Sequence, residues 1–404
     1  MRSFFRVAAA AAALLPIAAQ AQQASPKADD DTIVVTGVPL WETEKALKDC
    51  LARHCPPDED IRVTLAHAEN QFVAGDYKHA RETLLASRGR NQKYAAQYPV
   101  PVSDLLRANS RVAAHLGEGE AYRVGALDVV AALKAGLSED DPRVLVARVE
   151  VADSLFRFGR FKTAEQRYWD VVRDARRLKL PVVEGFALLR IASLYARLAE
   201  YDPANYGRSA NKALDRVINS PVPEHRPYAN AARVLKVRLA AKRGDDSAVD
   251  RVIADFRADP TERPVLLFST PVELPDESGR AGNDGSVTQR IATNPAEDQW
   301  VDVSFWVAPD GHPTDVAVLR ESKRLDDFWV KPVLASIEAR RYAPLKRDPT
   351  DPGVLRVERY TYTARWTRQT GSRLRVRETQ PRIEMLDLSA EPAGPVGTEG
   401  AKTR

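Results

Sequence analysis

Hydrophobic residues in the last third of the chain alternate with polar ones. From Val301 to Val307 every second residue is valine or phenylalanine, and Asp302 is the first of the residues between them. A period of two predicts a strand with one buried face. Pro309-Asp310-Gly311 then predicts a tight turn, because glycine adopts positive φ without strain. Alternation resumes from Thr314 to Val318, so we expect a β-hairpin.

A helix and a long strand are predicted after this hairpin. Apolar residues between Leu325 and Ile337 indicate a helix that covers the sheet, and Pro332 should either kink it or mark its start. The strand extends from Leu355 to Trp366. It places Tyr360, Tyr362 and Trp366 on one face. If this strand is the exposed edge of the sheet, these aromatic side chains are candidate partner contacts. The alternative is that they form the buried face.

The chain between about Trp41 and Ala258 is rich in alanine and leucine with helical spacing. Turn glycines recur at equal intervals of 42 residues, at Gly75, Gly117 and Gly159. The next two marks are Tyr201-Asp202 and Gly244. A fixed period predicts stacked helical hairpins that bury their apolar faces on their neighbours.

The best-matching units, around Gly75-Asp76-Tyr77 and Gly159-Arg160-Phe161, resemble tetratricopeptide repeats. The interval exceeds the roughly 34 residues usual in that family. We therefore expect a tetratricopeptide-like α-solenoid, and an irregular helical domain is the alternative.

Four features of the C-terminal region occur together: the alternation before Asp310-Gly311, the valine-rich return strand, Leu325-Asp326, and Arg341-Tyr342-x-Pro344. This combination resembles the C-terminal domain of TonB-type energy transducers, over about residues 262–370. The resemblance implies a small antiparallel sheet with helix. It also implies that a sheet edge receives an extended peptide of an outer-membrane receptor by strand addition.

The beginning of the chain predicts export. Arg2 and Arg6 precede an apolar run from Val7 to Leu15, and Ala19-Gln20-Ala21 follows as a cleavage site. The run is too short to cross a bilayer comfortably, which takes about 20 residues. We expect a cleaved signal peptide and a periplasmic protein with no stable membrane span; the alternative is an uncleaved anchor. The net charge of +4 does not imply nucleic-acid binding.

The two cysteines, Cys50 and Cys55, are separated by four residues. In an oxidising compartment such close thiols tend to pair. Pro56 and Pro57 end the preceding helix, so a disulfide would fix its terminus. Two free buried thiols are the main alternative. A zinc site is disfavoured because only His54 lies nearby and a closed site needs four ligands.

No sequence motif for catalysis is present: the chain has no G-x-S-x-G, no H-E-x-x-H and no P-loop. The six histidines are scattered, and we expect His67 and His79 at the surface. We predict neither an enzyme nor a cofactor or metal site.

The sequence thus predicts an α+β protein of two domains. We expect it to act as a periplasmic adaptor that binds proteins or peptides of the cell envelope; the resemblance implies TonB-dependent outer-membrane receptors among them. One partner binds the sheet edge and a second binds the solenoid. A helical scaffold for envelope assembly is the alternative. The expected divisions are 1–21 signal peptide, 22–40 disordered, 41–260 helical repeats, 262–385 C-terminal domain and 386–404 disordered tail.

Overall fold

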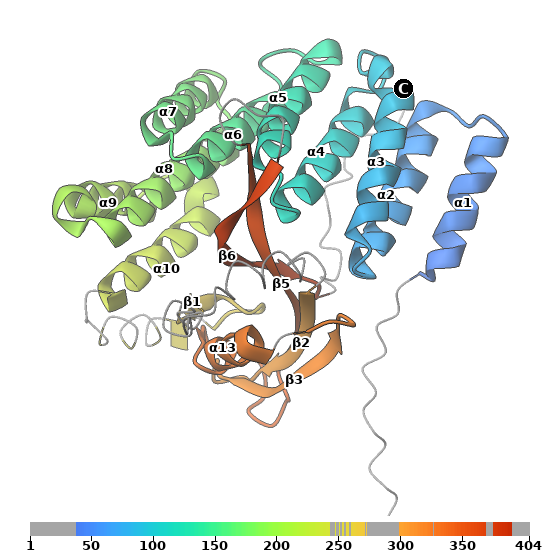
Figure 1. Ribbon diagram of the computed structural model, residues 1–404. Helices are drawn as coiled ribbons and strands as arrows, with labels where there is room; N and C mark the ends of the chain where they lie inside the picture. Colours follow the sequence, from blue (N-terminus) through green and yellow to red (C-terminus); the bar gives the residue numbers. More distant parts are fainter. Residues whose placement is uncertain are drawn as a thin grey trace, which may run out of the picture. The chain divides into compact units, whose positions relative to one another are not determined.

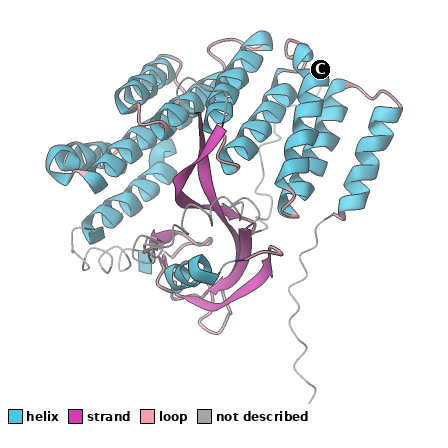
Figure 2. Cartoon of the chain, in the orientation of Figure 1, coloured by secondary structure: helices cyan, strands magenta, loops and turns pink. Residues whose placement is uncertain are grey.

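The computed structural model describes residues 38–389, apart from several residues between 243 and 259 and residues 271, 273–298, 326 and 369–374. The fold is α+β, with a helix-rich region followed by a sheet region (Figures 1 and 2). Residues 39–404 belong to one compact unit. The predicted signal peptide and most of the predicted N-terminal disordered segment lie outside the described residues.

The first region consists of consecutive helices joined by short turns. They are α1 (Leu40–Ala52), α2 (Pro57–Val73), α3 (Tyr77–Asn91), α4 (Pro99–His115), α5 (Gly119–Gly136), α6 (Pro142–Arg157), α7 (Phe161–Arg177), α8 (Pro181–Tyr201), α9 (Pro203–Ile218) and α10 (Arg226–Lys242), with the 3₁₀ turns η1 (Gln92–Tyr94) and η2 (Pro223–His225). Several begin with proline, whose fixed φ suits the first helical turn. Each helix packs against the next one in sequence.

Four of the five predicted turn marks are confirmed. Gly75, Gly117 and Gly159 lie between helices with φ of +82°, +77° and +72°, a region that favours glycine. Tyr201 ends α8 and Pro203 begins α9. Gly244 lies outside the described residues.

Two apolar cores hold the helices together, one drawn from α2 to α6 and the other from α6 to α10. Small residues such as Ala152, Ala164 and Ala187 are fully buried where helices cross. The absence of a long side chain at these positions lets the backbones approach closely. No helix in the described ranges is long and apolar enough to cross a membrane.

In its described residues, the second region contains two antiparallel sheets and one helix. The strands are β1 (Leu266–Phe268), β2 (Gln299–Val307), β3 (Pro313–Glu321), β4 (Arg341–Tyr342), β5 (Val354–Arg368) and β6 (Arg375–Asp387), and the helix is α13 (Asp327–Glu338). The larger sheet has the order β3-β2-β5-β6, and β1 pairs with β4. The alternating residues of β2 and Trp329 of α13 share one core.

The predicted hairpin is confirmed as β2 and β3, with Gly311 at φ +88° in its turn. Pro332 lies inside α13 and does not mark its start. The prediction of a single buried face on β2 is wrong, because Asp302 and Ser304 on the opposite face are also buried. That second face lies against the helical region. The last strand ends at Asp387, and the Ser389 hydroxyl donates to the backbone of Val357, so ordered chain continues past residue 385.

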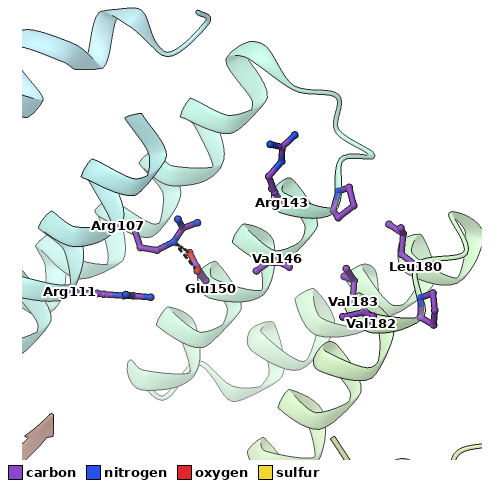
Figure 3. A pocket seen from close by; sticks show the side chains of 10 residues that line it. Arg107, Arg111, Arg143, Val146, Glu150, Leu180, Val182 and Val183 are labelled. Carbon is purple, nitrogen blue, oxygen red and sulfur yellow. Dashed lines mark hydrogen bonds and ion pairs between the residues drawn. The ribbon is translucent and has the colours of Figure 1, made fainter. Parts of the chain in front are cut away.

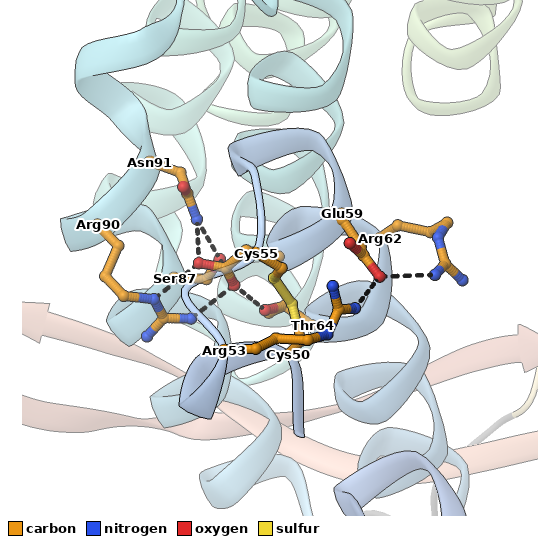
Figure 4. Close-up of a disulfide and its surroundings, with 10 residues drawn as sticks. Cys50, Arg53, Cys55, Glu59, Arg62, Thr64, Ser87, Arg90 and Asn91 are labelled. Atoms are coloured by element: carbon orange, nitrogen blue, oxygen red, sulfur yellow. Dashed lines mark hydrogen bonds and ion pairs between the residues drawn. A yellow bond between two sulfur atoms is a disulfide. The ribbon is translucent and has the colours of Figure 1, made fainter. Parts of the chain in front are cut away.

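Cys50 and Cys55 form a disulfide between the last turn of α1 and the start of α2, with Cα atoms 5.2 Å apart (Figure 4). That separation lies within the normal range for disulfides. Beside the disulfide, Asp60 accepts hydrogen bonds from Arg90 and Asn91, each at 2.8 Å. Burial acts to raise the pKa of Asp60, but these donors together with Thr64 hold that pKa below its usual value. The beginning of α2, next to the disulfide, is therefore held against α3 by these hydrogen bonds.

Candidate binding surfaces

The three aromatic residues predicted as partner contacts do not line a sheet edge. Their strand, β5, lies between β2 and β6, so the expected edge position is wrong. Tyr360 and Tyr362 are 2% and 8% exposed. These two tyrosines therefore belong to the buried face of the sheet, as the alternative interpretation expected. The Tyr362 ring stacks on Trp329 with centroids 5.9 Å apart. Trp366 is half-buried, and its backbone N–H donates to the Gly117 carbonyl at 3.2 Å.

Most of β5 is paired with other strands of this chain, on one side or on both. Residues 299–307 of β2 pair with residues 354–362, and β6 pairs with residues 358–368 from the other side. Beyond Tyr362, where β2 has ended, the turn between α4 and α5 meets β5 at Gly117. Of the described strands, β3 and β6 are the borders of the larger sheet.

A buried ion pair joins the sheet to the helices. Arg359 and Asp302 are both completely buried, and the Arg359 Nε and Nη2 donate to the Asp302 carboxylate at 2.6 and 2.9 Å. The remaining guanidinium hydrogens reach the carbonyls of Phe72 and Val73, at 2.8 and 2.7 Å. These carbonyls belong to the last turn of α2, where acceptors lack helical partners. Arg359 therefore caps a helix and pairs with a carboxylate, which also forms an ion pair with the half-exposed Arg320 at 2.7 Å.

Aromatic packing surrounds this ion pair. The Arg359 guanidinium lies over the Trp300 ring, 4.0 Å from its centroid. Trp300 in turn lies against Gly75, where an added Cβ would come 2.5 Å from the indole nitrogen. Gly75 is thus required twice, for its positive φ and for the approach of Trp300. This contact therefore serves the packing of the sheet against the helices.

His115, at the end of α4, lies in the same cluster. Its ring is 4.6 Å from that of Tyr77 and 4.9 Å from that of Phe72. Burial, together with the positive charges of Arg359 and Arg382, lowers the pKa of His115 to about 4. The folded state therefore keeps this imidazole neutral.

His115 should make stability fall as the medium is acidified. Its folded pKa lies below the unfolded value of about 6.5, so its contribution is complete above pH 6.5 and is lost as the pH falls to about 4. The loss should reach about 3 kcal/mol at most. Urea unfolding of the His115→Gln variant should show a weaker pH dependence than the unaltered chain between pH 7 and pH 4.5. The exposed His54→Asn variant is the control, and an equal effect of both would contradict this role of His115.

A groove on the helical region is a candidate binding site for a partner. It has a volume of about 660 Å³ and is formed by α4, α6 and the start of α8 (Figure 3). We call it the α4–α6–α8 groove. Its lining residues are Arg107, Arg111, Pro142, Arg143, Val146, Glu150, Leu180, Pro181, Val182 and Val183. A volume in this range suits a short peptide segment or a small molecule.

The groove combines fixed charges with exposed apolar surface. The Arg107 Nε donates to both carboxylate oxygens of Glu150, at 3.0 and 3.1 Å. This ion pair fixes both side chains between α4 and α6. Arg111 is exposed, and no hydrogen bond or ion pair of its side chain occurs among the described residues. Val182 is 56% exposed at the start of α8. The groove therefore combines an exposed cation on α4 with exposed apolar surface at the start of α8 (Figure 3).

No group of His, Cys, Asp and Glu side chains in the described part of the chain is arranged to hold a metal ion. His67, expected at the surface, is buried and lies 3.1 Å from the Thr43 hydroxyl. His79 remains exposed, beside Asp76. Sequence analysis did not single out any residue of the α4–α6–α8 groove.

No family model matches this sequence, and no curated protein is similar to it. Among solved structures, the chain is similar to BtubC (BKLC) from P. vanneervenii, at 14% identity and a TM-score of 0.42. The match covers 59% of this chain and 97% of that one. A likeness this weak carries no argument about function.

Proposed function

We propose that this protein is a non-enzymatic scaffold of the cell envelope, whose helices act as a tetratricopeptide-like solenoid that binds a partner protein. The observation that carries the proposal is the α4–α6–α8 groove, which is lined by the exposed Arg111 on one side and the apolar Val182 on the other (Figure 3). A partner segment with acidic and apolar side chains complements this surface. A periplasmic location is supported by the Cys50–Cys55 disulfide, since such bonds persist in oxidising compartments.

Peptide binding by the full chain tests the groove. A panel of extended peptides that differ only in acidic, neutral or basic side chains would be titrated by fluorescence anisotropy. Acidic peptides with apolar neighbours should bind most tightly, and Arg111→Glu should weaken that binding about tenfold or more, because it replaces attraction with repulsion. Val182→Asp should also weaken it by placing a charge on the apolar surface.

Two matched variants control for general effects of charge. Arg62→Glu changes an exposed arginine on α2, and Val124→Asp changes an exposed valine on α5. Both should leave binding unchanged. Equal losses for Arg62→Glu and Arg111→Glu, or equal binding of acidic and basic peptides, would rule out the groove as the site.

Strand addition of the TonB type is the second candidate, with β3 in place of β5 as the receiving edge. Among the described residues β3 pairs only with β2, which supports this choice. Pro313 and Asp315, whose φ is +52°, interrupt the start of that edge, and edge strands are often protected in this way. Addition would therefore be confined to Val316–Glu321. Methylation of alternate backbone nitrogens of a bound peptide would abolish binding at β3, whereas binding in the groove through side chains would survive.

A further inference from the structure

A second cavity, of about 710 Å³, lies where the helical and sheet regions meet. Its walls come from α8, α10, the segment after β1, α13, β5 and β6. We call it the inter-region cavity. It is separate from the α4–α6–α8 groove and shares no lining residue with it.

Cations dominate the lining of the inter-region cavity. Five lining side chains are positively charged and one, Glu200, is negatively charged; the cations are Arg197, Arg238, Lys242, Arg340 and Arg382. Four of these cations form ion pairs with carboxylates. Arg197 and Lys242 share Glu200, Arg340 pairs with Glu358, and Arg382 pairs with Glu384.

Arg238 is the exception. Its described hydrogen bond goes to a neutral acceptor, the Leu266 carbonyl, at 3.2 Å, and no described carboxylate lies within ion-pair distance of it. Burial lowers the pKa of Arg238, the positive charge of Arg340 lowers it further, and Glu200 opposes the change. The Nε atoms of Arg238 and Arg340 are both buried without a hydrogen-bond partner in the described structure. The Arg340 side chain is only 6% exposed.

Apolar side chains complete the cavity. Phe268 is the last residue of β1, and Ile383 and Met385 belong to β6. Met385 is 51% exposed, so an apolar surface accompanies the charged one. A ligand that fits both would carry a charged head and a short hydrocarbon part.

We propose that the inter-region cavity binds an amphipathic organic oxyanion, a carboxylate or a phosphate ester. Its head would lie between Arg238 and Arg340, and its hydrocarbon part would lie against Phe268, Ile383 and Met385. Guanidinium groups match the geometry of carboxylate and phosphate oxygens, and their bonds to such anions are among the stronger hydrogen bonds in proteins. Such a ligand would supply the negative charge that Arg238 lacks, and it would join the two regions of the fold.

The test uses the full chain and four probes: octyl phosphate, octanoate, inorganic phosphate and the uncharged octyl glucoside. Calorimetric titration and the thermal shift of unfolding are measured for each. At least one of the two amphipathic anions should bind and raise the melting temperature. Inorganic phosphate should bind more weakly because it lacks the hydrocarbon part. The comparison of octyl phosphate with octanoate identifies which oxyanion is preferred.

Arg238→Gln should weaken anion binding about tenfold or more. The substitution gives up the weak Nη2 bond to Leu266 but also removes a buried positive charge that has no paired carboxylate among the described residues, so the unliganded variant should be about as stable as the unaltered chain. Arg233→Gln is the matched control, since Arg233 is exposed on the same helix. Arg238→Lys keeps the charge without the fork and should give an intermediate loss, which keeps the test decisive if Arg238→Gln does not fold.

Three results would overturn the proposal: no binding of either amphipathic anion at about 1 mM, equal affinities of the Arg238→Gln and Arg233→Gln variants, or equal binding of octyl glucoside. Because peptide binding to the α4–α6–α8 groove is measured with different variants, either site can fail without the other.

Discussion

Replacing Asp302 with asparagine is expected to lower the free energy of unfolding by about 3–5 kcal/mol. The substitution removes the negative charge and keeps the size of the side chain. Arg359 would remain fully buried with its positive charge uncompensated, since its other hydrogen-bond acceptors are the neutral carbonyls of Phe72 and Val73. Breaking a buried pair costs much more than the intact pair contributes, because one charge stays out of water.

Urea unfolding followed by circular dichroism would measure this loss. Asp49→Asn is the control, because Asp49 also pairs with a cation, Lys45 at 2.6 Å, but both side chains are mostly exposed. Pairs of that kind contribute little, so no measurable change is expected there. A small effect of Asp302→Asn, similar to that of the control, would show that the ion pair does not hold the sheet against the helices.

Trp329→Ala should destabilise the protein by a comparable amount, about 3–5 kcal/mol. Trp329 is completely buried on α13, where its ring stacks on Tyr362 and its Nε1 donates to Gln299 at 2.9 Å. Its removal leaves a cavity at the centre of the C-terminal core and a buried amide that loses a donor. Both effects act in the same direction.

Trp41→Ala provides a matched control for the second prediction. Trp41 is 65% exposed on α1, and its removal should change stability by less than about 0.5 kcal/mol. The free energies of unfolding of both variants can be compared by denaturant titration. If Trp329→Ala were no worse than Trp41→Ala, the core assigned to α13 and the sheet would be wrong.

Local pattern was sufficient for those parts of the fold that local sequence determines. The alternation from Val301 to Val307 predicted β2, and the turn at Gly311 predicted its hairpin. The strand predicted from Leu355 to Trp366 is found as Val354–Arg368. The spacing of Gly75, Gly117 and Gly159 located three turns correctly, because each requires a residue that tolerates positive φ.

Pairings between distant segments could not be predicted from the same patterns. β6 was not predicted as a strand of the sheet because the first half of its sequence shows no alternation of polar and apolar residues. Arg375, Arg377 and Glu378 are among these residues. Without β6, β5 was taken for a border strand, and its tyrosines for contacts. Asp302 gave the same difficulty, since a carboxylate normally indicates an exposed position, and its buried partner Arg359 lies 57 residues away.

The candidate sites depend even more on such distant placement. Arg111 and Val182 are ordinary surface residues of two separate helices, and only the placement of these helices on either side of α6 brings both residues into one groove. Arg238 and Arg340 come from different regions of the chain. No motif of fixed spacing links these pairs, so sequence reasoning had no signal for either site.

The capping of α2 by Arg359 limits how this protein can be dissected. Two of the hydrogen bonds to the last turn of that helix come from Arg359, 286 and 287 positions later in the chain. A protein shortened to end near residue 260 would lose those donors and would uncover the rings of Phe72 and Tyr77. Failure of such a fragment to capture a partner would then report damage to α2 and not the location of a binding site. Single substitutions in the intact chain avoid that ambiguity.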